Sequence, residues 1–337
     1  MKTEAPAPLL SIIVVTRDRA EELRTISLPS LARQDTRGFE LIVWDASEDD
    51  RTQKLVEAFA ADHPDFAVRY FKAPRAGSCA QRNDAVRKAR GEIVFFIDDD
   101  SEVSPDGVAA LLDMFARQQA LIGGGLPLDY RWPLKDGRLI GRTHRFTASL
   151  VTTYNKVFNP WPRLSGLFPA IPPNVPGPVD HLFGCDMAFR ISVFRDHVFD
   201  ERLQKFSGYG LWEDQLLSYQ LHQEGFMLCI ADKGFVVHRA GSGDRGGKSF
   251  RAGQMDGYNA GIVWSACVFP YVPWSIIPFL WSRVGFLFVV LLPCIIRPWQ
   301  TIRWSRMAGY LAGLWTFAVE GIRGIKSGVS NESLRPL

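Results

Sequence analysis

Three consecutive aspartates, Asp98, Asp99 and Asp100, directly follow an apolar run at residues 93–97. An apolar run that stops at three carboxylates predicts a buried strand that delivers acids to the edge of a sheet. Neighbouring carboxylates repel one another, so they need either a bound cation or raised pKa values. Oxygen ligands of this kind suit Mg2+ or Mn2+, ions that usually also bind a substrate phosphate. A solvated acidic loop after a strand is the alternative interpretation.

Three further side chains are candidates for chemistry. Glu213 and Asp214 lie at the start of a predicted helix over residues 213–224, where backbone amides and the helix dipole keep a carboxylate ionised. A carboxylate held in this way could accept a proton from an attacking hydroxyl group. Acids that only stabilise the start of the helix are the alternative. His238 ends an apolar strand and is predicted either as a metal ligand or as a hydrogen-bonded buried histidine.

The glycine-rich segment 241–249 imitates two nucleotide-binding motifs. Residues 241–246 have the GxGxxG spacing of a dinucleotide fingerprint, and residues 247–249 (Gly-Lys-Ser) imitate the end of a phosphate-binding loop. The distances from these glycines to Lys248 do not fit that loop, and no further strand-helix-strand unit follows to hold a dinucleotide. We interpret the segment as a cationic flap over bound phosphate, with Arg245 or Lys248 supplying charge. An ordinary solvated loop is the alternative.

The elements that must position these residues alternate between strand and helix. Strand patterns cover residues 10–16, 41–44, 68–72 and 93–98, and helix patterns cover 20–33, 54–61 and 78–90, the last with Gly91 as its C-cap. This order predicts an α/β fold with a single doubly wound, mostly parallel sheet and flanking helices. Ligands bind such sheets beyond the carboxyl ends of the strands. Thr16, Asp45 and Asp98 lie at those ends, so we expect them to converge.

The pattern is less regular after the aspartates. Ser104 and Pro105 predict the start of a helix that runs to about residue 118, and a strand is predicted over 121–129. Residues 130–180 are rich in Pro, Trp and Phe and are predicted to form a long irregular insertion. We therefore expect one α/β domain over residues 1–260 and an apolar, basic helical tail over residues 261–337.

Composition adds information about location. The five cysteines of the 337-residue chain form no metal-binding or disulfide spacing, which fits a reducing compartment. The first apolar run is too short for a secretion signal, so we expect a cytoplasmic protein. From Trp274 onward the chain has seven Lys or Arg and two acids, which favours an anionic membrane surface over nucleic acid as a partner.

The tail has two apolar stretches, at residues 262–296 and 307–322. Prolines and Arg283 interrupt the first, and its part at 284–296 is too short to span a bilayer comfortably alone. Flanking Trp and Arg residues suit helices that lie in a membrane interface. We therefore predict peripheral or monotopic attachment to the inner face of the cell membrane. A buried helical pair, or a homo-oligomer interface, is the alternative.

Seven short motifs occur in a fixed order between residues 9 and 239. They are Ser11-Ile-Ile-Val-Val-Thr-Arg-Asp-Arg19, Val43-Trp-Asp-Ala-Ser47, Gly77-Ser-Cys-Ala-Gln-Arg-Asn83 with Gly91-Glu92, Phe96-Ile-Asp-Asp-Asp100, Gly184-Cys-Asp-Met-Ala-Phe-Arg190, Trp212-Glu-Asp-Gln215 and Val237-His238. In their order and spacing they resemble the family-2 glycosyltransferases, which have the GT-A fold. The resemblance implies a metal-dependent, inverting enzyme that moves a hexosyl or deoxyhexosyl group from a nucleoside-diphosphate sugar to a hydroxyl group. The predicted membrane location, and not the resemblance, suggests a lipid-linked saccharide as the acceptor, so we expect a glycan or lipid-linked saccharide in surface polysaccharide or glycolipid assembly.

The resemblance also implies a role for each matching residue. Thr16, Arg17 and Asp45 would contact the nucleotide, with Asp45 at the base. Asp98 and Asp99 would bind the nucleotide sugar, with Asp98 near the ribose and Arg82 orienting the first aspartate. Asp100 and His238 would hold Mg2+ or Mn2+, and Asp214 would be the general base. Acceptor or donor contacts are expected from Asp186, where the family often has Asn, and from Trp212, Glu213, Arg245 and Lys248.

Two other functions fit part of the pattern. A nucleotidyltransferase that makes nucleotide sugars also places carboxylates and a metal on an α/β sheet. Such an enzyme is expected to have a glycine-rich loop with a lysine near the first strand, whereas residues 16–19 contain no glycine. A non-catalytic glycan-binding protein is the third interpretation, and the retention of every acid in the proposed site argues against it.

Overall fold

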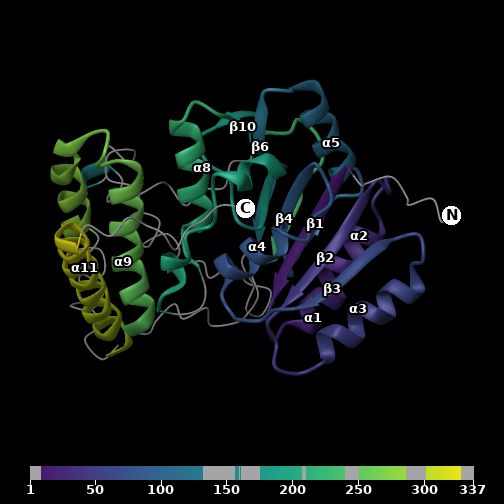
Figure 1. The fold of residues 1–337 in the computed structure, drawn as a ribbon, viewed down its shortest axis with the longest axis horizontal. Helices are drawn as coiled ribbons and strands as arrows, with labels where there is room; N and C mark the ends of the chain where they lie inside the picture. Colours follow the sequence, from purple (N-terminus) through teal and green to yellow (C-terminus); the bar gives the residue numbers. More distant parts are fainter. Residues whose placement is uncertain are drawn as a thin grey trace.

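The computed structural model describes residues 9–131, 156–158, 160, 175–206, 210–239, 250–285 and 301–327. Its main sheet has eight strands in the order β3-β2-β1-β4-β9-β6-β10-β8 (Figure 1). Five strands form the half that carries the aspartates: β1 (Leu10–Thr16), β2 (Phe39–Asp45), β3 (Ala67–Lys72), β4 (Ile93–Asp98) and β9 (Asp186–Arg190). The other three are β6 (Leu121–Gly125), β8 (Gly177–Val179) and β10 (Met227–Ile230). Only β9 and β8 pair antiparallel with their neighbours, so the predicted α/β fold with a mostly parallel sheet is confirmed.

The central strands are apolar along their whole length because helices cover both faces of the sheet. Ile13, Val94 and Phe96 point to a core shared with α4 (Ser78–Val86) and α8 (Glu213–Gln223). Ile12, Val14 and Phe95 point to the opposite core, shared with α3 (Arg51–Asp62) and α5 (Gly107–Arg117). Each strand therefore alternates between two buried faces, and the polar residues that follow the strands are fixed at the sheet edge.

A second sheet of three strands lies beside the carboxyl end of β4. Its order is β5 (Ser101–Val103), β11 (Val236–Arg239) and β7 (Leu128–Arg131). The antiparallel register pairs His238 with Ser101, and the amide of Arg239 donates to the carbonyl of Asp100 at 2.9 Å. Strand β5 starts directly after the aspartates, so this sheet brings His238 next to them across 138 positions of sequence.

Several predicted boundaries were wrong. The predicted helix 20–33 is α1 (Ala20–Glu22), a π-helical stretch η1 (Leu23–Ser27) and α2 (Leu28–Ala32). Helix α4 ends at Val86, and Gly91 is not its C-cap: a side chain there would collide with the backbone of Leu10 and Ser11. Helix α5 begins at Gly107 because Ser104 bonds Asp106 and Phe235 instead of capping.

The predicted strand 121–129 is also two strands, β6 and β7, which belong to different sheets. Three short 3-10 segments were not predicted: η3 (Ile191–Arg195), η4 (Glu201–Gln204) and η5 (Pro273–Ser275). The predicted insertion at 130–180 lies mostly outside the described residues.

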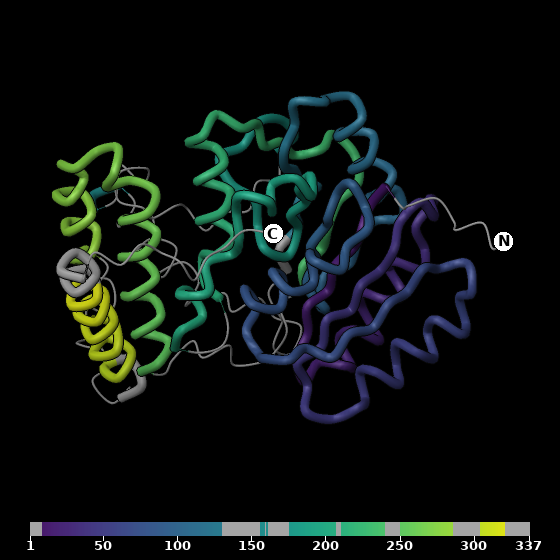
Figure 2. The backbone as a smooth tube through the Cα atoms, in the orientation of Figure 1, coloured from purple at the N-terminus to yellow at the C-terminus, as the bar shows by residue number. Residues whose placement is uncertain are grey.

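The C-terminal helices α9 (Phe250–Cys267) and α11 (Thr301–Ser327) pack against each other to one side of the sheet (Figure 2). A side chain at Gly253 would overlap the carbonyl of Arg306, and one at Gly257 would overlap that of Tyr310. The contact residue on α11 moves from 306 to 310 as the glycine on α9 moves from 253 to 257, so the two helices run parallel. Helix α9 continues through the predicted boundary at residue 260, and its Tyr258, Ile262 and Val263 belong to the core that includes α4 and α8. No helix in the described part of the chain is long and apolar enough to cross a bilayer.

Candidate active site

The carboxyl ends of β1, β2 and β4 meet at one edge of the sheet, as the sequence predicted. The parallel register aligns Thr16 with Asp45, and Val15 with Asp98. The polar residues that leave these strands therefore face each other.

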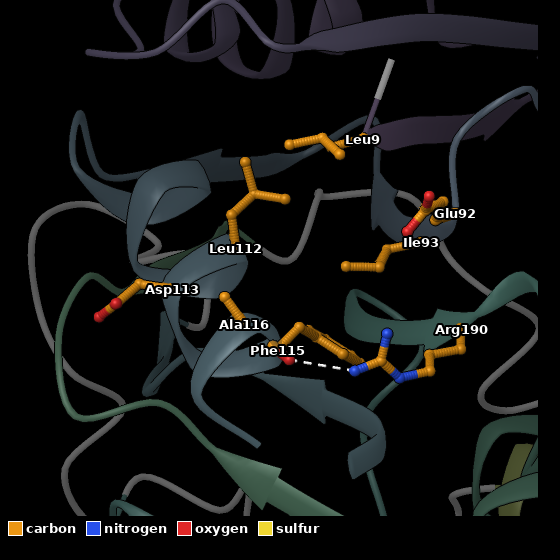
Figure 3. Close-up of a pocket in the computed structure, with 8 residues that line it drawn as sticks. All are labelled: Leu9, Glu92, Ile93, Leu112, Asp113, Phe115, Ala116 and Arg190. Atoms are coloured by element: carbon orange, nitrogen blue, oxygen red, sulfur yellow. Dashed lines mark hydrogen bonds between the residues drawn. The ribbon is translucent and has the colours of Figure 1, made fainter. Parts of the chain in front are cut away.

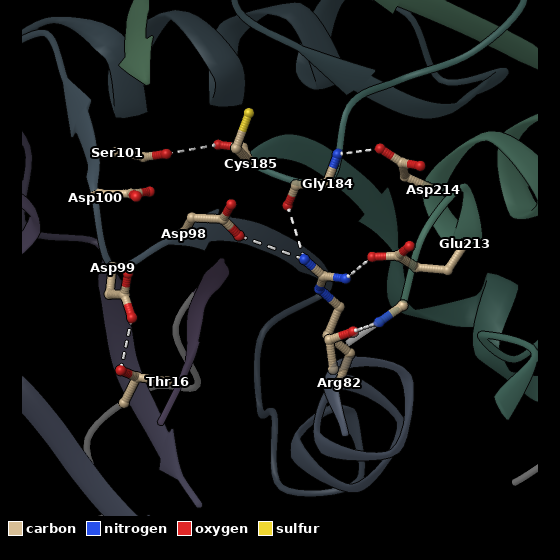
Figure 4. Close-up of polar contacts among 12 residues, drawn as sticks. Thr16, Arg82, Asp98, Asp99, Asp100, Ser101, Gly184, Cys185, Glu213 and Asp214 are labelled. Atoms are coloured by element: carbon tan, nitrogen blue, oxygen red, sulfur yellow. Dashed lines mark hydrogen bonds and ion pairs between the residues drawn. The ribbon is translucent and has the colours of Figure 1, made fainter. Parts of the chain in front are cut away.

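The three aspartates point in two directions (Figure 4). The Asp100 carboxylate lies 2.9 Å from Nε2 of His238, and the Asp98 carboxylate lies 3.4 Å from the same atom. Asp99 turns the other way and accepts a hydrogen bond from the Thr16 hydroxyl at 2.7 Å. Burial, together with the charges of Asp100 and Asp98, raises the pKa of Asp99 to about 7, although Arg19 and Thr16 oppose this shift. Because Asp99 turns away, only the carboxylates of Asp98 and Asp100 face His238.

Asp98, Asp100 and His238 could hold a metal ion. One ligand atom from each lies within 4.8 Å of the other two. Two carboxylates and an imidazole form a donor set that divalent ions such as Mn2+ accept. Burial opposes protonation of His238, but the hydrogen-bonded carboxylates of Asp100 and Asp98 outweigh it and raise its pKa to about 9. The site thus attracts a positive charge, which a metal ion can supply in place of the proton.

Arg19 is a site residue that the sequence analysis missed. Its guanidinium bonds Asp99 through Nε at 2.7 Å and Asp100 through Nη2 at 2.5 Å. This bridge offsets part of the repulsion between two adjacent buried acids. Its position could have predicted this role. Arg19 lies three residues after Thr16 in the loop that follows β1, and this loop must face the loop after the parallel neighbour β4.

Arg82 connects the aspartates to the start of α8. Its buried guanidinium bonds Glu213 at 2.5 Å and Asp98 at 3.4 Å, and it also donates to the carbonyl of Gly184 at 3.3 Å. The predicted contact between Arg82 and the first aspartate is therefore present. Glu213, predicted as an acceptor or donor contact, is buried and is the partner of Arg82.

Asp214 is held by backbone amides at the first turn of α8. One carboxylate oxygen accepts from Gly184 at 2.6 Å and the other accepts from Gln215 at 2.8 Å. Burial raises the pKa of Asp214, and these two amides oppose the shift. The same Gly184 that orients Asp214 through its amide accepts from Arg82 through its carbonyl, so one peptide segment links Asp214 to the aspartate group.

The predicted nucleotide contacts differ in exposure. Asp45 is fully buried; one carboxylate oxygen accepts from the amide and hydroxyl of Ser47, and the other accepts from Tyr70 at 2.9 Å. Arg17 is exposed beside Asp18, and Thr16 is buried against Asp99. Arg17 is therefore directly accessible to a ligand at the end of the first strand. Asp45 could contact a nucleotide base only after it loses its hydrogen bond to Ser47 or Tyr70.

The remaining predicted contacts are placed as follows. Asp186 is buried, and both oxygens accept from the amide of Leu126 at 3.0–3.1 Å, which favours a structural role. Burial raises the pKa of Asp186 to about 8. Trp212 is partly buried directly before Glu213 and has a φ of 70°, a left-handed conformation that is rare for a bulky residue. Arg245 and Lys248 lie outside the described residues.

A pocket of about 300 Å3 lies at the opposite end of the strands (Figure 3). Leu9 and Ile93 line it at the start of β1 and β4, so it does not adjoin the aspartates. Its one cation, Arg190, already donates to the carbonyls of Phe115 and Leu121. We do not assign the chemistry to this pocket.

Curated proteins that match part of the chain include two named glycosyltransferases. One is a GalNAc(5)-diNAcBac-PP-undecaprenol beta-1,3-glucosyltransferase from Campylobacter jejuni, 32% identical over 107 residues, which are 31% of this chain and 34% of the relative. The other is the putative colanic acid biosynthesis glycosyl transferase WcaA from Escherichia coli, 32% identical over 116 residues, which are 34% and 39% of the two chains. The match thus spans little more than a third of either relative.

Solved structures share the fold. The mannosyltransferase PcManGT from Pyrobaculum calidifontis, solved with GDP-Man and Mn2+, has a TM-score of 0.55 at 17% identity and covers 92% of this chain and 88% of its own. GalNAc-T7, solved with UDP, GalNAc and Mn2+, has a TM-score of 0.50 at 16% identity and covers 70% and 44%.

The sequence profile of one family, "Glycosyl transferase family 2", matches residues 11–197, which are more than half of the chain. This range holds the strand ends, Arg82, the three aspartates and Asp186, whose geometry is described above. The chain therefore belongs to glycosyl transferase family 2.

Proposed function

We propose that the protein is a metal-dependent, inverting glycosyltransferase that moves a sugar from a nucleoside-diphosphate sugar to a hydroxyl group of a glycan or lipid-linked saccharide. The observation that carries the proposal is the grouping of Asp98, Asp100 and His238, joined through Arg82 and Gly184 to Asp214. A cation site and a proton acceptor are the two components that this transfer requires.

The donor is proposed to bind across the strand ends. Asp98, Asp100 and His238 would hold Mn2+ or Mg2+, which supplies Lewis acidity toward the diphosphate when bound. The presence of Mn2+ in PcManGT and GalNAc-T7 supports this choice. Arg17, exposed at the end of β1, is available to the nucleotide, and Arg19 keeps Asp99 and Asp100 in place.

Asp214 is proposed to take the proton from the acceptor hydroxyl. The amides of Gly184 and Gln215 fix the orientation of its carboxylate, and burial raises its pKa toward the range in which a base works near neutral pH. Attack from the face opposite the departing diphosphate inverts the anomeric carbon in one displacement. Glu213 is engaged by Arg82 and is therefore a weaker candidate for the base.

A lipid-linked or polysaccharide acceptor is supported by two observations. The Campylobacter relative is named for an undecaprenol-linked substrate, and WcaA is named for colanic acid biosynthesis. The described C-terminal region also exposes large apolar side chains between residues 269 and 284: Phe269, Tyr271, Trp274, Ile276, Ile277, Leu280, Trp281 and Val284. We propose that this apolar surface rests on the inner face of the cell membrane.

The substitution Asp100→Asn tests the cation site. It keeps the size of the side chain but removes one anionic ligand, so Mn2+-dependent donor binding should weaken at least about tenfold and transfer should be lost. Titration of Mn2+ into protein with a panel of nucleotide sugars, followed by calorimetry, measures both donor and metal affinity.

The control is Glu102→Gln, which removes a charge two residues away that bonds only Arg33 and Arg239 among the described residues. Equal metal dependence in the parent and Asp100→Asn would remove Asp100 from the site. A parent chain that binds glycans but neither transfers nor hydrolyses any nucleotide sugar would instead support the non-catalytic interpretation. Family membership leaves the nucleotidyltransferase interpretation without support.

A further inference from the structure

The backbone that leads into Asp214 is strained and must be held by its surroundings. Trp212 has a φ of 70°, a left-handed conformation that is unfavourable for a non-glycine residue. Its peptide directly precedes Glu213 and Asp214, so relaxation of Trp212 would turn both acids. A strained segment of this kind persists only where neighbouring groups fix it.

The first contact that fixes the segment before Trp212 comes from α4. The amide of Gly210 donates to the hydroxyl of Ser78 at 2.6 Å. Any side chain at Gly210 would approach Cys79, Ser78 and Glu213 within about 3 Å, so the backbone passes close to the start of α4.

The second contact that fixes this segment comes from the C-terminal helix α9. Asn259 is fully buried, and its Nδ2 donates to the carbonyl of Leu211 at 3.0 Å and to the carbonyl of Leu203 at 2.8 Å. One amide group thus binds the residue before Trp212 and the end of the η4 turn together. Its Oδ1 is buried and has no hydrogen-bond partner among the described residues. The donor half of the amide is therefore the part that makes the contacts.

Helix α9 is itself fixed to both neighbours. Tyr258 donates to Glu320 of α11 at 2.7 Å, and Lys205, next to the η4 turn, also bonds Glu320. On the α8 side, Gln223 donates to the carbonyl of Cys267. A shift of the C-terminal helices would therefore move Asn259 and reach the start of α8 through the carbonyl of Leu211.

From this geometry we propose that Asn259 is a positioning residue for Asp214, and that the C-terminal helices keep the proton acceptor in its working orientation. The inference rests on the proposed role of Asp214. It gives the C-terminal region a part in transfer besides membrane attachment. Donor binding depends on the cation group and the strand ends, none of which Asn259 contacts, so it should not change.

The test compares Asn259→Leu, which removes both donated bonds and keeps the branching of the side chain, with Asn259→Ser, which can donate to only one carbonyl. The full chain is used with its active donor and Mn2+. We expect kcat for transfer to fall about tenfold or more in Asn259→Leu, and less in Asn259→Ser, while donor affinity and donor-binding stoichiometry match the parent. Hydrogen exchange at amides 213–215 should become faster in the same order.

The matched control is Ser265→Ala, which removes a bond to the carbonyl of Ile262 within α9 and leaves Leu203 and Leu211 paired. Its kcat should equal that of the parent. If Asn259 has a purely structural role, its substitution should lower the melting temperature, the donor-binding stoichiometry and the transfer rate together, and that result overturns the proposal. A kcat equal to that of the parent in both variants also overturns it. Should Asn259→Leu not fold, Asn259→Ser decides by the same criteria. If the parent itself neither binds donor nor transfers, the proposed function fails, independently of Asn259.

Discussion

Asp214 is the residue whose substitution should separate chemistry from binding. Asp214→Asn keeps the shape but cannot accept the proton, so transfer in a single-turnover assay should fall about 100-fold or more while donor affinity persists. The control is Glu224→Gln beyond the other end of α8, where Glu224 bonds His197. Transfer within a few-fold of the parent would exclude Asp214 as the base.

Asp186 should make stability depend on pH. Burial raises its pKa to about 8 in the folded protein, above the ordinary value of 3.8. The folded state therefore binds more protons than the unfolded state between these values, so stability falls as pH rises from about 4 to about 8 and levels off above that. Asp186→Asn cannot ionise, so it should stabilise the protein by on the order of 2 kcal/mol at pH 8 and by much less at pH 4.

Thermal unfolding at both pH values measures this difference, with the surface substitution Asp113→Asn on α5 as the control. A difference between Asp186→Asn and the parent that is constant with pH would show that the buried carboxyl is ionised in the folded protein.

Sequence reasoning found most of the residues around the site but not their connections. Acids at strand ends are visible because apolar runs stop at them, and this located Asp98 and Asp100. The bridge from Arg19 and the turn of Asp99 toward Thr16 depend on the register between β1 and β4, which no local pattern contains. His238 could be named only as an alternative, since its distance from Asp100 is set by the pairing of β5 with β11.

At the scale of elements, glycines determine how α9 packs against α11. A Cβ at Gly257 would overlap the carbonyl of Tyr310, so Gly257→Ala should force the helices apart and destabilise the protein by about 1–3 kcal/mol. Gly38→Ala is the control because no heavy atom lies within 4 Å of the added Cβ, and its effect should stay within about 0.5 kcal/mol. Urea unfolding measures both values. Equal stabilities would show that the two helices are not closely packed in solution.

The order and type of the main elements were predictable, whereas their ends often were not. Apolar strands and amphipathic helices are local patterns, so β1 to β4 and the helices between them were predicted. The strands β8, β9 and β10 and the order of the eight strands in the sheet were not predicted. The π-helical stretch at 23–27 and the start of α5 depend on side-chain partners elsewhere in the chain. The glycines of α9 and α11 looked like ordinary residues in an apolar tail; their role became visible only when the opposite backbone was placed against them.

At the scale of the whole molecule, the C-terminal region has a packed inner surface and an exposed apolar outer surface. The inner surface packs α9 on α8 and on α11, so truncation near residue 261 would remove part of the core. Two of the seven basic residues are also less available than the sequence implied: Arg283 is 3% exposed and Arg306 bonds Asp256. Our proposal of membrane attachment therefore rests on the apolar outer surface.

The triple substitution Trp274→Ser, Ile277→Ser and Leu280→Ser tests that surface without cutting the chain. These side chains are 54–69% exposed, and each can contribute on the order of 1.5–3 kcal/mol when buried in an apolar phase. The parent should float with anionic vesicles, with only a modest loss at high salt, and the triple variant should stay in the soluble fraction. Phe235→Ser, which removes an exposed aromatic ring between β10 and β11, should float like the parent. Size-exclusion chromatography distinguishes membrane attachment from an oligomer interface. If the triple variant still floats but changes from oligomer to monomer, these residues join copies of the chain. The lipid-linked acceptor would then lose the support that membrane attachment by this surface provides.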